Sequence, residues 1–394
     1  MYKIYRMGQG EIDAAARVLS SRFLFKVNGG PYQECMNFEE ELRQKFNVKN
    51  AVYVTSGKAA LISALVGMGV GPGDQVIVPA YTYIATAMAV VAVGAIPVIA
   101  DVDDTLTLDP IDVERKITPA TKVIFPVHIH GLPCNMDAIC EIAKKHNLMV
   151  LEDACQADGG SYKGKRLGTI GDAGALSFNA FKIISAGEGG ALLTNNDKIF
   201  HGAHIYQDAS GIAFFGDQLA QNDIEPFCGV EYRTNELGAA VMREQLKGMD
   251  DLLADLRKTK KALMDGLSDT FEFAPSNDPE GDCGITLPLK FDDPEKARAF
   301  SEKIYGEGVM GELPIDTGKH VYSNWTPILN KRGALNPLMD PFKMEANKDI
   351  IPDYSVDMCP KTLDILSKNV YVSSRAQFTD EDIKRIIDTC KKYA

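Results

Sequence analysis

Short, continuously apolar runs alternate with segments of helical spacing through the first half of the chain. Strands that are apolar on both faces are typical of a parallel sheet covered by helices. The intervening residues 136–146 have helical spacing, and Asn37 followed by Glu40 is a modest capping signal for an earlier helix. The pattern predicts an α/β domain with a largely parallel sheet. The predicted strands are residues 51–54, 75–78, 96–99, 122–125, 148–151 and 175–178.

The second half of the chain has a different pattern. Residues 235 to about 267 have apolar positions between charges, which predicts one long helix. A strand-like stretch at 285–289 and helices at 294–305 and from Thr379 onward predict a smaller α+β domain, with long loops in the Pro- and Gly-containing residues 306–360. We therefore divide the chain into a large domain, 1–250, with an N-terminal segment, and a small C-terminal domain, 251–394.

Composition narrows the class of protein and of partner. The chain has 394 residues, of which 45% are hydrophobic, and this suits packed cores in two domains. A net charge of -12 without a dense Lys/Arg stripe argues against nucleic acid as a partner. Residues 85–100 are apolar but are broken by glycine and proline, and Met1 to Arg6 is not a signal peptide. We expect a cytoplasmic protein that binds small molecules, with no membrane partner.

The cysteines give no sign of a metal or of disulfides. Eight cysteines are scattered without a CxxC pair, and Cys134 and Cys140 are too far apart for the usual zinc spacing. We expect reduced thiols, mostly in the core.

The first candidate site is the stretch from Val54 to Leu61, a strand that ends in small residues and passes directly into a helix. Free backbone N–H groups at such a helix N-terminus bind anions, phosphate above all. Gly57-Lys58 suggests a nucleotide P-loop, but Val52 and Ala59 stand where that motif needs Gly and Ser/Thr. From these residues alone, an ordinary tight connection remains as good an interpretation as phosphate binding.

Carboxylates and aromatic rings follow other strand ends. Asp153 comes at the end of an apolar strand, where a carboxylate can keep a pyridinium nitrogen protonated; a helix N-cap is the alternative. Tyr81 or Tyr83 could cover a planar cofactor, although core packing explains a lone tyrosine as well. His128 and His130 lie past a further strand end and are expected to line the site at most.

Lys182 follows the last predicted strand and precedes a glycine cluster. A desolvated lysine loses its charge readily, and its neutral amine can form a Schiff base with an aldehyde cofactor. Taken alone, a solvated surface lysine is the commoner case.

Together these motifs resemble the DegT/DnrJ/StrS family of pyridoxal-phosphate sugar aminotransferases. The resemblance covers nearly the whole chain and keeps the order of several separate motifs. They are Thr55-Ser56-Gly57-Lys58-Ala59-Ala60-Leu61, Gly71-Pro72-Gly73-Asp74, Pro79-Ala80-Tyr81-Thr82-Tyr83, Glu152-Asp153-Ala154-Cys155-Gln156, Gly171-Asp172, Ser177-Phe178, Lys182, Gly187-Glu188-Gly189-Gly190 and Tyr232-Arg233.

The resemblance implies a role for each matching residue. Lys182 is the Schiff-base lysine that also shuttles the proton, and Asp153 is the partner of the pyridinium nitrogen. Gln156 contacts the ring hydroxyl, and Tyr83 stacks on the ring. The phosphate is held by Ser56, Gly57, Lys58 and Ser177.

Two positions depart from the family pattern. Glu231 stands where many relatives carry an Asn that reaches the neighbouring subunit's phosphate site, and Lys58 stands where Thr is common. A carboxylate beside a phosphate is repelled. Glu231 therefore either turns away, pairing with Lys58 or Arg233, or contacts a substrate amino group. A Lys58–Glu231 exchange across a dimer explains both departures, so Glu231 is kept among the cofactor residues.

The implied fold is fold type I, with a mostly parallel seven-stranded sheet in the large domain, in a homodimer with shared active sites. The implied reaction is ping-pong: L-glutamate, or less commonly glutamine, converts pyridoxal 5'-phosphate to pyridoxamine 5'-phosphate, which then aminates an oxo-sugar. A member with His at position 182 suggests a dehydratase instead; Lys182 favours transamination.

The substrate suggested by the nearest likeness is an 8-oxo form of Kdo, aminated to 8-amino-3,8-dideoxy-manno-octulosonate for lipopolysaccharide. A nucleotide-linked keto-deoxyhexose is the alternative, and a non-catalytic regulatory protein with the same fold is the alternative of another class. A sugar acid needs a cation for its carboxylate. The expected substrate contacts are Arg22, Lys26, His128, Arg233 and His320.

Overall fold

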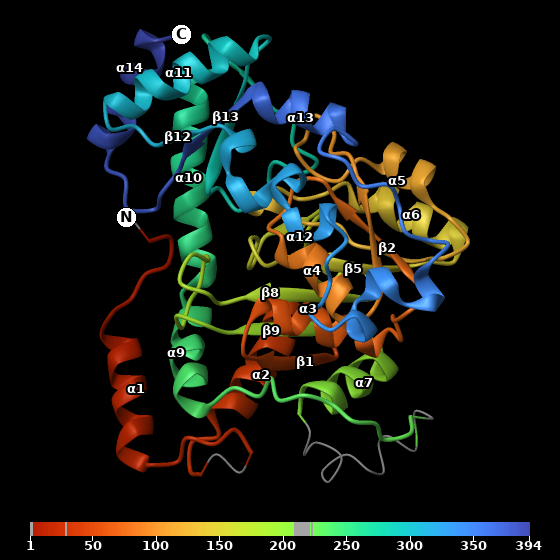
Figure 1. Ribbon diagram of the computed structural model, residues 1–394. Coiled ribbons are helices and arrows are strands. Elements are labelled where there is room, and N and C mark those ends of the chain that lie inside the picture. The colour runs from red at the N-terminus through yellow and green to blue at the C-terminus, as the bar shows by residue number, and fades with distance from the viewer. Residues whose placement is uncertain (1–2, 28–29, 209–220, 222–223) are drawn as a thin grey trace.

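A seven-stranded sheet forms the centre of the large domain (Figure 1). In spatial order its strands are β1 (Asn50–Val54), β9 (Gly190–Thr194), β8 (Ala173–Ser177), β5 (Met149–Asp153), β4 (Thr121–Ile124), β2 (Gln75–Pro79) and β3 (Ile96–Ala100). β9 is antiparallel to both neighbours, and all the other adjacent pairs are parallel. The computed structural model describes residues 3–27, 30–208, 221 and 224–394. The predicted mostly parallel seven-stranded sheet is confirmed.

The six strands predicted from the apolar runs all form, each within two residues of its predicted ends. Their side chains are almost entirely buried because helices cover both faces of the sheet. β9 was not predicted from the pattern. Its sequence Gly-Ala-Leu-Leu-Thr contains only one β-branched residue and directly follows a glycine cluster.

Two groups of helices cover the sheet. Leu61, Ala87 and Ile199 belong to the apolar cluster on one face, and Leu42, Val113 and Ile139 belong to the cluster on the other. The first face carries α3 (Gly57–Gly67), α4 (Ala85–Ala92) and α7 (Asp197–Gln207), and the second carries α2 (Glu34–Phe46), α5 (Pro110–Lys116), α6 (Met136–His146) and α9 (Glu236–Lys247). α6 has its predicted bounds, whereas α2 begins three residues before Asn37.

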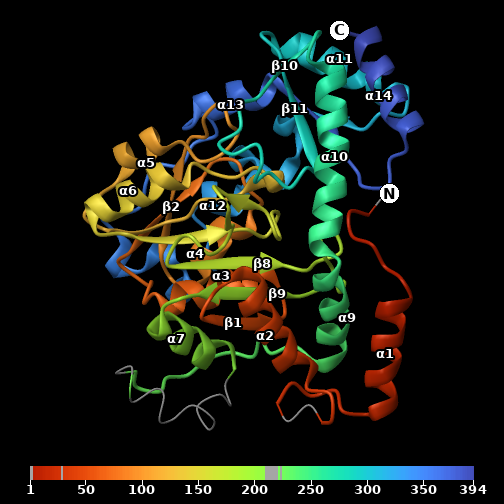
Figure 2. The ribbon, with the colours of Figure 1, turned by 180° about the vertical axis from the view of Figure 1, so that it is seen from behind.

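The predicted long helix is two helices that meet at Gly248. α9 ends there and α10 (Met249–Leu267) begins, and Figures 1 and 2 show them forming a rod from the large sheet to the small domain. Gly248 has φ -87° and ψ 0°, within the right-handed helical region but displaced from regular α-helix values, and glycine is destabilising inside a helix. α1 (Gln9–Ser21) lies along α9 and packs on Ala240 through Ala14 and Val18.

A four-stranded antiparallel sheet forms the centre of the small domain. Its order is β10 (Glu272–Phe273), β11 (Thr286–Lys290), β13 (Asn369–Ser373) and β12 (Gly311–Glu312). α11 (Pro294–Gly306) and α14 (Asp380–Lys392) pack on it through Phe300 and Ile386. The predicted small α+β domain is thus present, and the predicted boundary at residue 251 falls inside α10.

The stretch predicted as long loops, 306–360, contains short helical turns that return to the large domain. Tyr322 and Trp325 are fully buried in the cluster that covers one face of the large sheet. The remaining elements are α12 (Thr326–Leu329), α13 (Pro360–Ser367), the hairpin β6 (Ser161–Tyr162) and β7 (Lys165–Arg166), and 3-10 turns at Ile129–Gly131, Pro314–Asp316, Gly318–His320, Tyr322–Asn324, Pro337–Met339, Pro341–Lys343 and Glu345–Asn347. The division at residues 250 and 251 remains a prediction.

Candidate active site

Asp153 is the last residue of β5, at the carboxyl ends of the parallel strands, where open α/β sheets bind ligands. Its side chain is 6% exposed. Thr86 Oγ1 donates a hydrogen bond of 2.8 Å to Oδ2, and the backbone N–H of Cys155 donates one of 3.1 Å to Oδ1. These donors fix the orientation of the carboxyl, while each oxygen keeps capacity for a further donor.

The N-terminus of α3 meets the end of β8 beside Asp153. Ser56 is the N-cap, and its Oγ accepts a hydrogen bond from the N–H of Ala59, which leaves the hydroxyl proton available to donate. A Cβ on Gly57 would lie 2.8 Å from Ser177 Cβ and 2.7 Å from Cys155 Sγ. Only glycine therefore allows the helix end to approach both strand ends. The first amides of α3 have no acceptor within the helix, so this corner suits an anion.

Lys182 lies in the loop that joins β8 to β9. The loop folds back on itself, because the N–H of Phe178 donates to Gly189 O at 2.9 Å and that of Ala180 donates to Gly187 O at 3.0 Å. The N–H of Lys182 donates to Asn179 O at 3.0 Å. These bonds hold the half-buried lysine just past the end of β8, the neighbour of β5 in the sheet.

The charge of Lys182 shifts the pKa values of groups in several segments. Burial raises the pKa of the Asp158 carboxyl well above its ordinary value, and the Lys182 ammonium opposes this. Burial lowers the pKa of His130 to about 3, with further lowering by the charges of His320, Lys182 and Arg375. The charge of Lys182 thus acts on Asp158, in the turn after β5, and on His130 and His320, which belong to two separate segments.

Tyr83, His320 and His130 form an aromatic wall at this end of the sheet. The ring centroids of Tyr83 and His320 are 5.3 Å apart, and those of His320 and His130 are 6.0 Å apart. The N–H of His130 donates to Gln156 Oε1 at 3.0 Å, which leaves the donor end of the Gln156 amide for another group. The predicted residues Tyr83, Gln156 and His320 are therefore brought together.

Lys58 and Glu231 do not pair with each other within the subunit. Arg233 Nη2 lies 3.0 Å from a carboxylate oxygen of Glu231, and Arg233 Nη1 donates to Asp208 at 2.7 Å. Of the alternatives left open for Glu231, the structure has the pair with Arg233. Burial lowers the pKa of Lys58, which forms no ion pair with any described residue. An exchange across a dimer remains a prediction.

The expectation that His128 contacts a substrate is wrong. Its imidazole is fully buried, with Nδ1 accepting from the N–H of Cys134 and Nε2 donating to Glu152, each at 3.1 Å. Glu152 also accepts the backbone N–H groups of Gly168, Ile170 and Gly171. Both residues have a structural role because they hold the loop that precedes β8. A histidine after a strand end is equally compatible with either role.

The cations expected to bind a sugar acid are placed differently. Lys26 is 7% exposed and donates to Glu39 Oε1 at 2.6 Å and to Tyr53 O at 2.8 Å, so it joins α2 to β1. Arg22 is exposed at the end of α1. Arg233 has two carboxylate partners and lies over the Phe25 ring at 4.6 Å. Lys26 is thus a structural residue, and roles for Arg22 and Arg233 stay predictions.

Two residues at this site were not singled out in the sequence. Thr86, which holds Asp153, follows Tyr83 by three residues, and Asp158 follows Asp153 by five. Asp158 is fully buried. Small polar residues near a predicted strand end were the available signal, but only the fold shows which of them point inward.

The residues present fit pyridoxal phosphate. Ser56, Gly57, Lys58 and Ser177 offer an anion-binding corner, Asp153 offers a buried acceptor for a protonated ring nitrogen, and Lys182 offers the amine. The glycine cradle at position 57 is specific evidence, since a side chain there would fill the corner.

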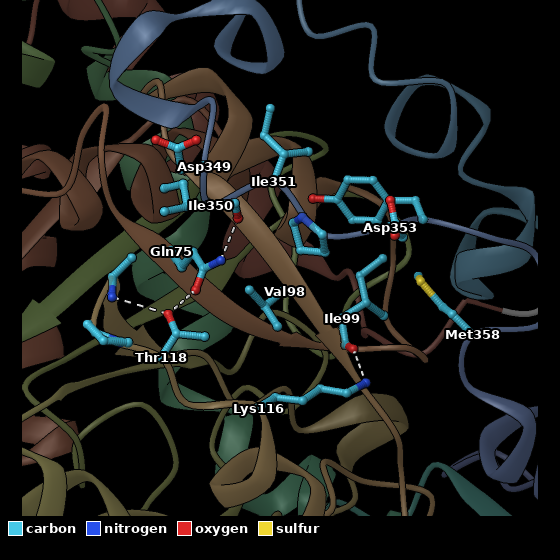
Figure 3. Close-up of a pocket in the computed structure, with 14 residues that line it drawn as sticks. Gln75, Val98, Ile99, Lys116, Thr118, Asp349, Ile350, Ile351, Asp353 and Met358 are labelled. Carbon is cyan, nitrogen blue, oxygen red and sulfur yellow. Dashed lines mark hydrogen bonds between the residues drawn. The ribbon is translucent and has the colours of Figure 1, made fainter.

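A cavity of about 670 Å³ lies elsewhere, between the edge strand β3 and residues 349–358 (Figure 3). It includes Gln75, the first residue of β2, whereas Asp153 is the last residue of β5, the middle strand of the sheet. Its polar side chains have protein partners: Gln75 Nε2 donates to Ile350 O at 2.5 Å, and Lys116 Nζ donates to Ile99 O at 2.5 Å. The Gln75 bond attaches the segment to β2, and Tyr354 Oη attaches it to the edge strand β3 by donating to Pro97 O at 2.6 Å, which explains the cavity without a ligand.

The described residues contain no disulfide, no cluster of metal ligands and no helix that could span a membrane. The eight cysteines are free thiols, six of them buried. Among the residues that the structure places, no three His, Cys, Asp or Glu side chains gather as metal ligands do, and no helix is both long and apolar enough to span a bilayer.

Comparison with known proteins identifies the relatives of this chain. Residues 6–302 match the DegT/DnrJ/EryC1/StrS aminotransferase family. GDP-perosamine synthase of Caulobacter vibrioides is 42% identical over 220 residues, which are 56% of this chain and 58% of that protein. The alignment thus covers less than two thirds of that relative.

Solved structures extend the likeness over the full length. An aminotransferase from Psychrobacter cryohalolentis superposes with a TM-score of 0.82 at 27% identity, over 100% of this chain and 98% of that one. A protein of Streptococcus pneumoniae solved in its PMP form, at 21% identity, has a TM-score of 0.78 over 100% of this chain and 98% of that one, a likeness of fold. The fold is therefore that of the pyridoxal-phosphate aminotransferases, as expected.

Proposed function

Because the chain belongs to the DegT/DnrJ/EryC1/StrS aminotransferase family, we propose that it is a sugar aminotransferase that uses pyridoxal phosphate. The observation that carries the proposal is the meeting of Lys182, Asp153 and the Gly57 corner at one end of the sheet. An amine, a buried carboxylate and an anion cradle match the aldehyde, the ring nitrogen and the phosphate of one cofactor.

Each residue then has a defined task. When bound, pyridoxal phosphate supplies an electron sink that stabilises negative charge on the substrate carbon. Asp153 keeps the ring nitrogen protonated, helped by Thr86, which holds its Oδ2. Ser56, Lys58 and Ser177 bind the phosphate. Lys182 moves a proton at the substrate carbon.

We propose L-glutamate as the amino donor and an oxo-sugar as the acceptor. The acceptor that we propose is 8-oxo-Kdo. The alternative acceptor is a nucleotide-linked keto-deoxyhexose, and the name of the relative GDP-perosamine synthase supports it. The contacts proposed for the acceptor are His320, which lies beside Tyr83, the exposed Arg22 and the largely buried Arg233.

Mass spectrometry of the products tests this choice. The protein, loaded with pyridoxal phosphate and given L-glutamate, should aminate 8-oxo-Kdo in preference to a GDP- or dTDP-linked keto-deoxyhexose. Amination of only the nucleotide sugars would replace the sugar-acid proposal by its alternative. Amination of neither, with no spectral change on adding L-glutamate or L-glutamine, would favour a non-catalytic regulatory protein. Lys182→Ala is the matched control.

We further propose a homodimer. Ile12, Ala16 and Leu19 are exposed at a spacing that puts them on one face of α1, opposite the buried Ala14 and Val18. Phe23 and Phe25 follow and are more than half exposed. An apolar surface of this extent in a water-soluble chain is typical of an interface.

A further inference from the structure

A second cavity, of about 360 Å³, opens beside the aromatic wall, between the large and small domains. His130 belongs both to this wall and to the lining of the cavity. Its size falls in the range of small-ligand sites, about 300–1,000 Å³. The polar side chains of the lining are His130, Thr286, Tyr305, Glu312, Tyr371, Ser373 and Arg375.

Four buried polar atoms of this lining have no hydrogen-bond partner among the described residues. They are His130 Nε2, Thr286 Oγ1, Tyr371 Oη and Arg375 Nε. Buried polar groups are paired in the great majority of cases, because an unpaired one costs about 1–3 kcal/mol. Four of them in the lining of one cavity therefore indicate a ligand that supplies their partners.

Arg375 carries the charge of this cavity. It follows β13 and donates through Nη1 to Ser374 O at 2.6 Å and to Ile285 O at 3.3 Å, which fixes the guanidinium but does not neutralise it. No carboxylate in the described part of the chain pairs with it. Burial lowers the pKa of Arg375, but a guanidinium remains charged at neutral pH. A half-buried arginine without an anion is costly unless a ligand brings one.

The cavity adjoins the candidate active site through His130. The N–H of His130 donates to Gln156 Oε1 at 3.0 Å, its ring centroid lies 6.0 Å from that of His320, and the charges of Lys182 and Arg375 both act on its imidazole. The N-terminal segment makes a second connection, since Ile4 lines the cavity while Lys3 Nζ donates to Ala180 O at 3.3 Å, two residues before Lys182. Gln377 Nε2 holds this segment by donating to Lys3 O at 3.1 Å. Figure 2 shows the described segment that precedes α1 running from the side of the small domain.

We propose that Arg375, with Thr286 and His130, binds the carboxylate of a substrate whose reacting carbon lies at Lys182. The proposal deepens the proposed function and rests on it for the identity of the substrate. A guanidinium offers two parallel N–H donors that match a carboxylate, and a threonine hydroxyl and a neutral imidazole can donate to the same group. Glu312 is the only carboxyl of the lining; burial raises its pKa, and it suits a sugar hydroxyl rather than an anion.

Two substrates of the proposed reaction carry a carboxylate, namely the sugar acid and glutamate. Calorimetric binding to the holoenzyme separates them. Kdo itself probes the sugar carboxylate without a reacting carbonyl at carbon 8, and glutarate probes the amino donor. Arg375→Met should weaken binding of one probe at least about tenfold, which is typical for a charge-assisted pair. The probe that is weakened identifies the source of the carboxylate.

Matched variants keep the test free of folding artefacts. Arg375→Lys, which keeps the charge but loses the planar fork, should weaken the same probe less than Arg375→Met does. Thr286→Val, of similar shape, should weaken it several-fold. Arg385→Met removes a cation from exposed α14 and should change nothing. Native-like melting temperatures check that each variant is folded.

The carboxylate site is contradicted if the native holoenzyme binds neither probe, or if Arg375→Met and Arg375→Lys change both affinities by less than about twofold. Turnover is read separately. A protein that binds a probe through Arg375 but transfers no amino group supports the carboxylate site and contradicts the proposed function. A protein that transfers an amino group but binds neither probe through Arg375 supports the proposed function and contradicts the carboxylate site.

Discussion

Lys58 brings a positive charge to the first turn of α3, beside Ser56 and Gly57. Because it forms no ion pair with a described residue, a phosphate is its natural partner in the subunit. We predict that Lys58→Ala raises the dissociation constant for pyridoxal phosphate by about ten- to a hundredfold, as expected for loss of a charged hydrogen bond. Titration of cofactor-free protein by absorbance measures this.

The control for this prediction is Lys49→Ala, which removes an exposed lysine that pairs with Asp197 outside the site. An affinity for the cofactor equal to that of the native protein would show that Lys58 does not bind the phosphate. Glu231→Ala tests the exchange across a dimer, because that exchange predicts weaker retention of the cofactor. Unchanged retention would leave Glu231 as the partner of Arg233 only.

Asp158 should make the cofactor-free protein sensitive to pH. Burial raises its pKa well above the ordinary value of 3.8, so the folded protein keeps a proton that the unfolded chain releases. The stability contribution of such a group is present below the ordinary pKa and is lost as pH rises toward the folded pKa. Asp158→Asn, which cannot ionise, should therefore raise the melting temperature by a few degrees, more at mildly alkaline than at mildly acidic pH.

Asp137→Asn is the control for Asp158. Its exposed carboxyl has a pKa lowered by a hydrogen bond from Lys163, so its removal offers no gain at high pH. An equal melting temperature for Asp158→Asn and the native protein at both pH values would mean that Asp158 is not held protonated by burial.

At the scale of elements, the N-terminus of α3 should tolerate no side chain at Gly57. A Cβ there would lie 2.7 Å from Cys155 Sγ and 2.8 Å from Ser177 Cβ, so α3 has to move away from the strand ends. We predict that Gly57→Ala destabilises the protein by about 1–3 kcal/mol, as overpacking does, and weakens pyridoxal-phosphate binding. Urea unfolding and cofactor titration measure the two effects.

Gly306→Ala is the matched substitution, because a Cβ at the end of α11 would meet nothing within 4 Å. It should be neutral or slightly stabilising. If Gly57→Ala behaved like Gly306→Ala in both measurements, the close approach of α3 to β5 and β8 would not matter for the site.

The elements that the sequence predicted share one property, which is a signal contained in their own residues. The apolar runs of β2 and β3 give nearly exact strands, and the spacing of 136–146 gives α6. β9 was not predicted because its residues resemble a glycine-rich loop. It forms a strand because it pairs with β1 on one side and β8 on the other. The break between α9 and α10 at Gly248 was not predicted because the apolar positions continue across it.

The site could be predicted where chemistry follows a strand end and not where it depends on long-range packing. Asp153 and Ser56 lie where their local sequence placed them. His128 also follows a strand end, as a site residue would. Both of its ring nitrogens are nevertheless hydrogen-bonded within the protein, one to the N–H of Cys134 and the other to Glu152. Arg375 is more than 190 residues from Lys182, so only the fold relates the two.

For the whole molecule, the exposed apolar face of α1 predicts a dimer. We expect Ile12→Glu to shift the mass in solution toward the monomer, because it places a charge in the proposed interface. Ile111→Glu, at an even more exposed isoleucine on α5, should leave the mass unchanged. Light scattering after size-exclusion chromatography measures both. A native protein that is monomeric at high concentration would contradict the dimer.

The central claim is that Lys182 bonds covalently to pyridoxal phosphate. Borohydride reduction of the purified protein in the presence of the cofactor, followed by proteolysis and mass spectrometry, tests it most directly. The account predicts one phosphopyridoxyl group per chain, on the peptide that contains Lys182, and none in Lys182→Ala. A group on Lys58 or another lysine, or no modified peptide in the native protein, would contradict it.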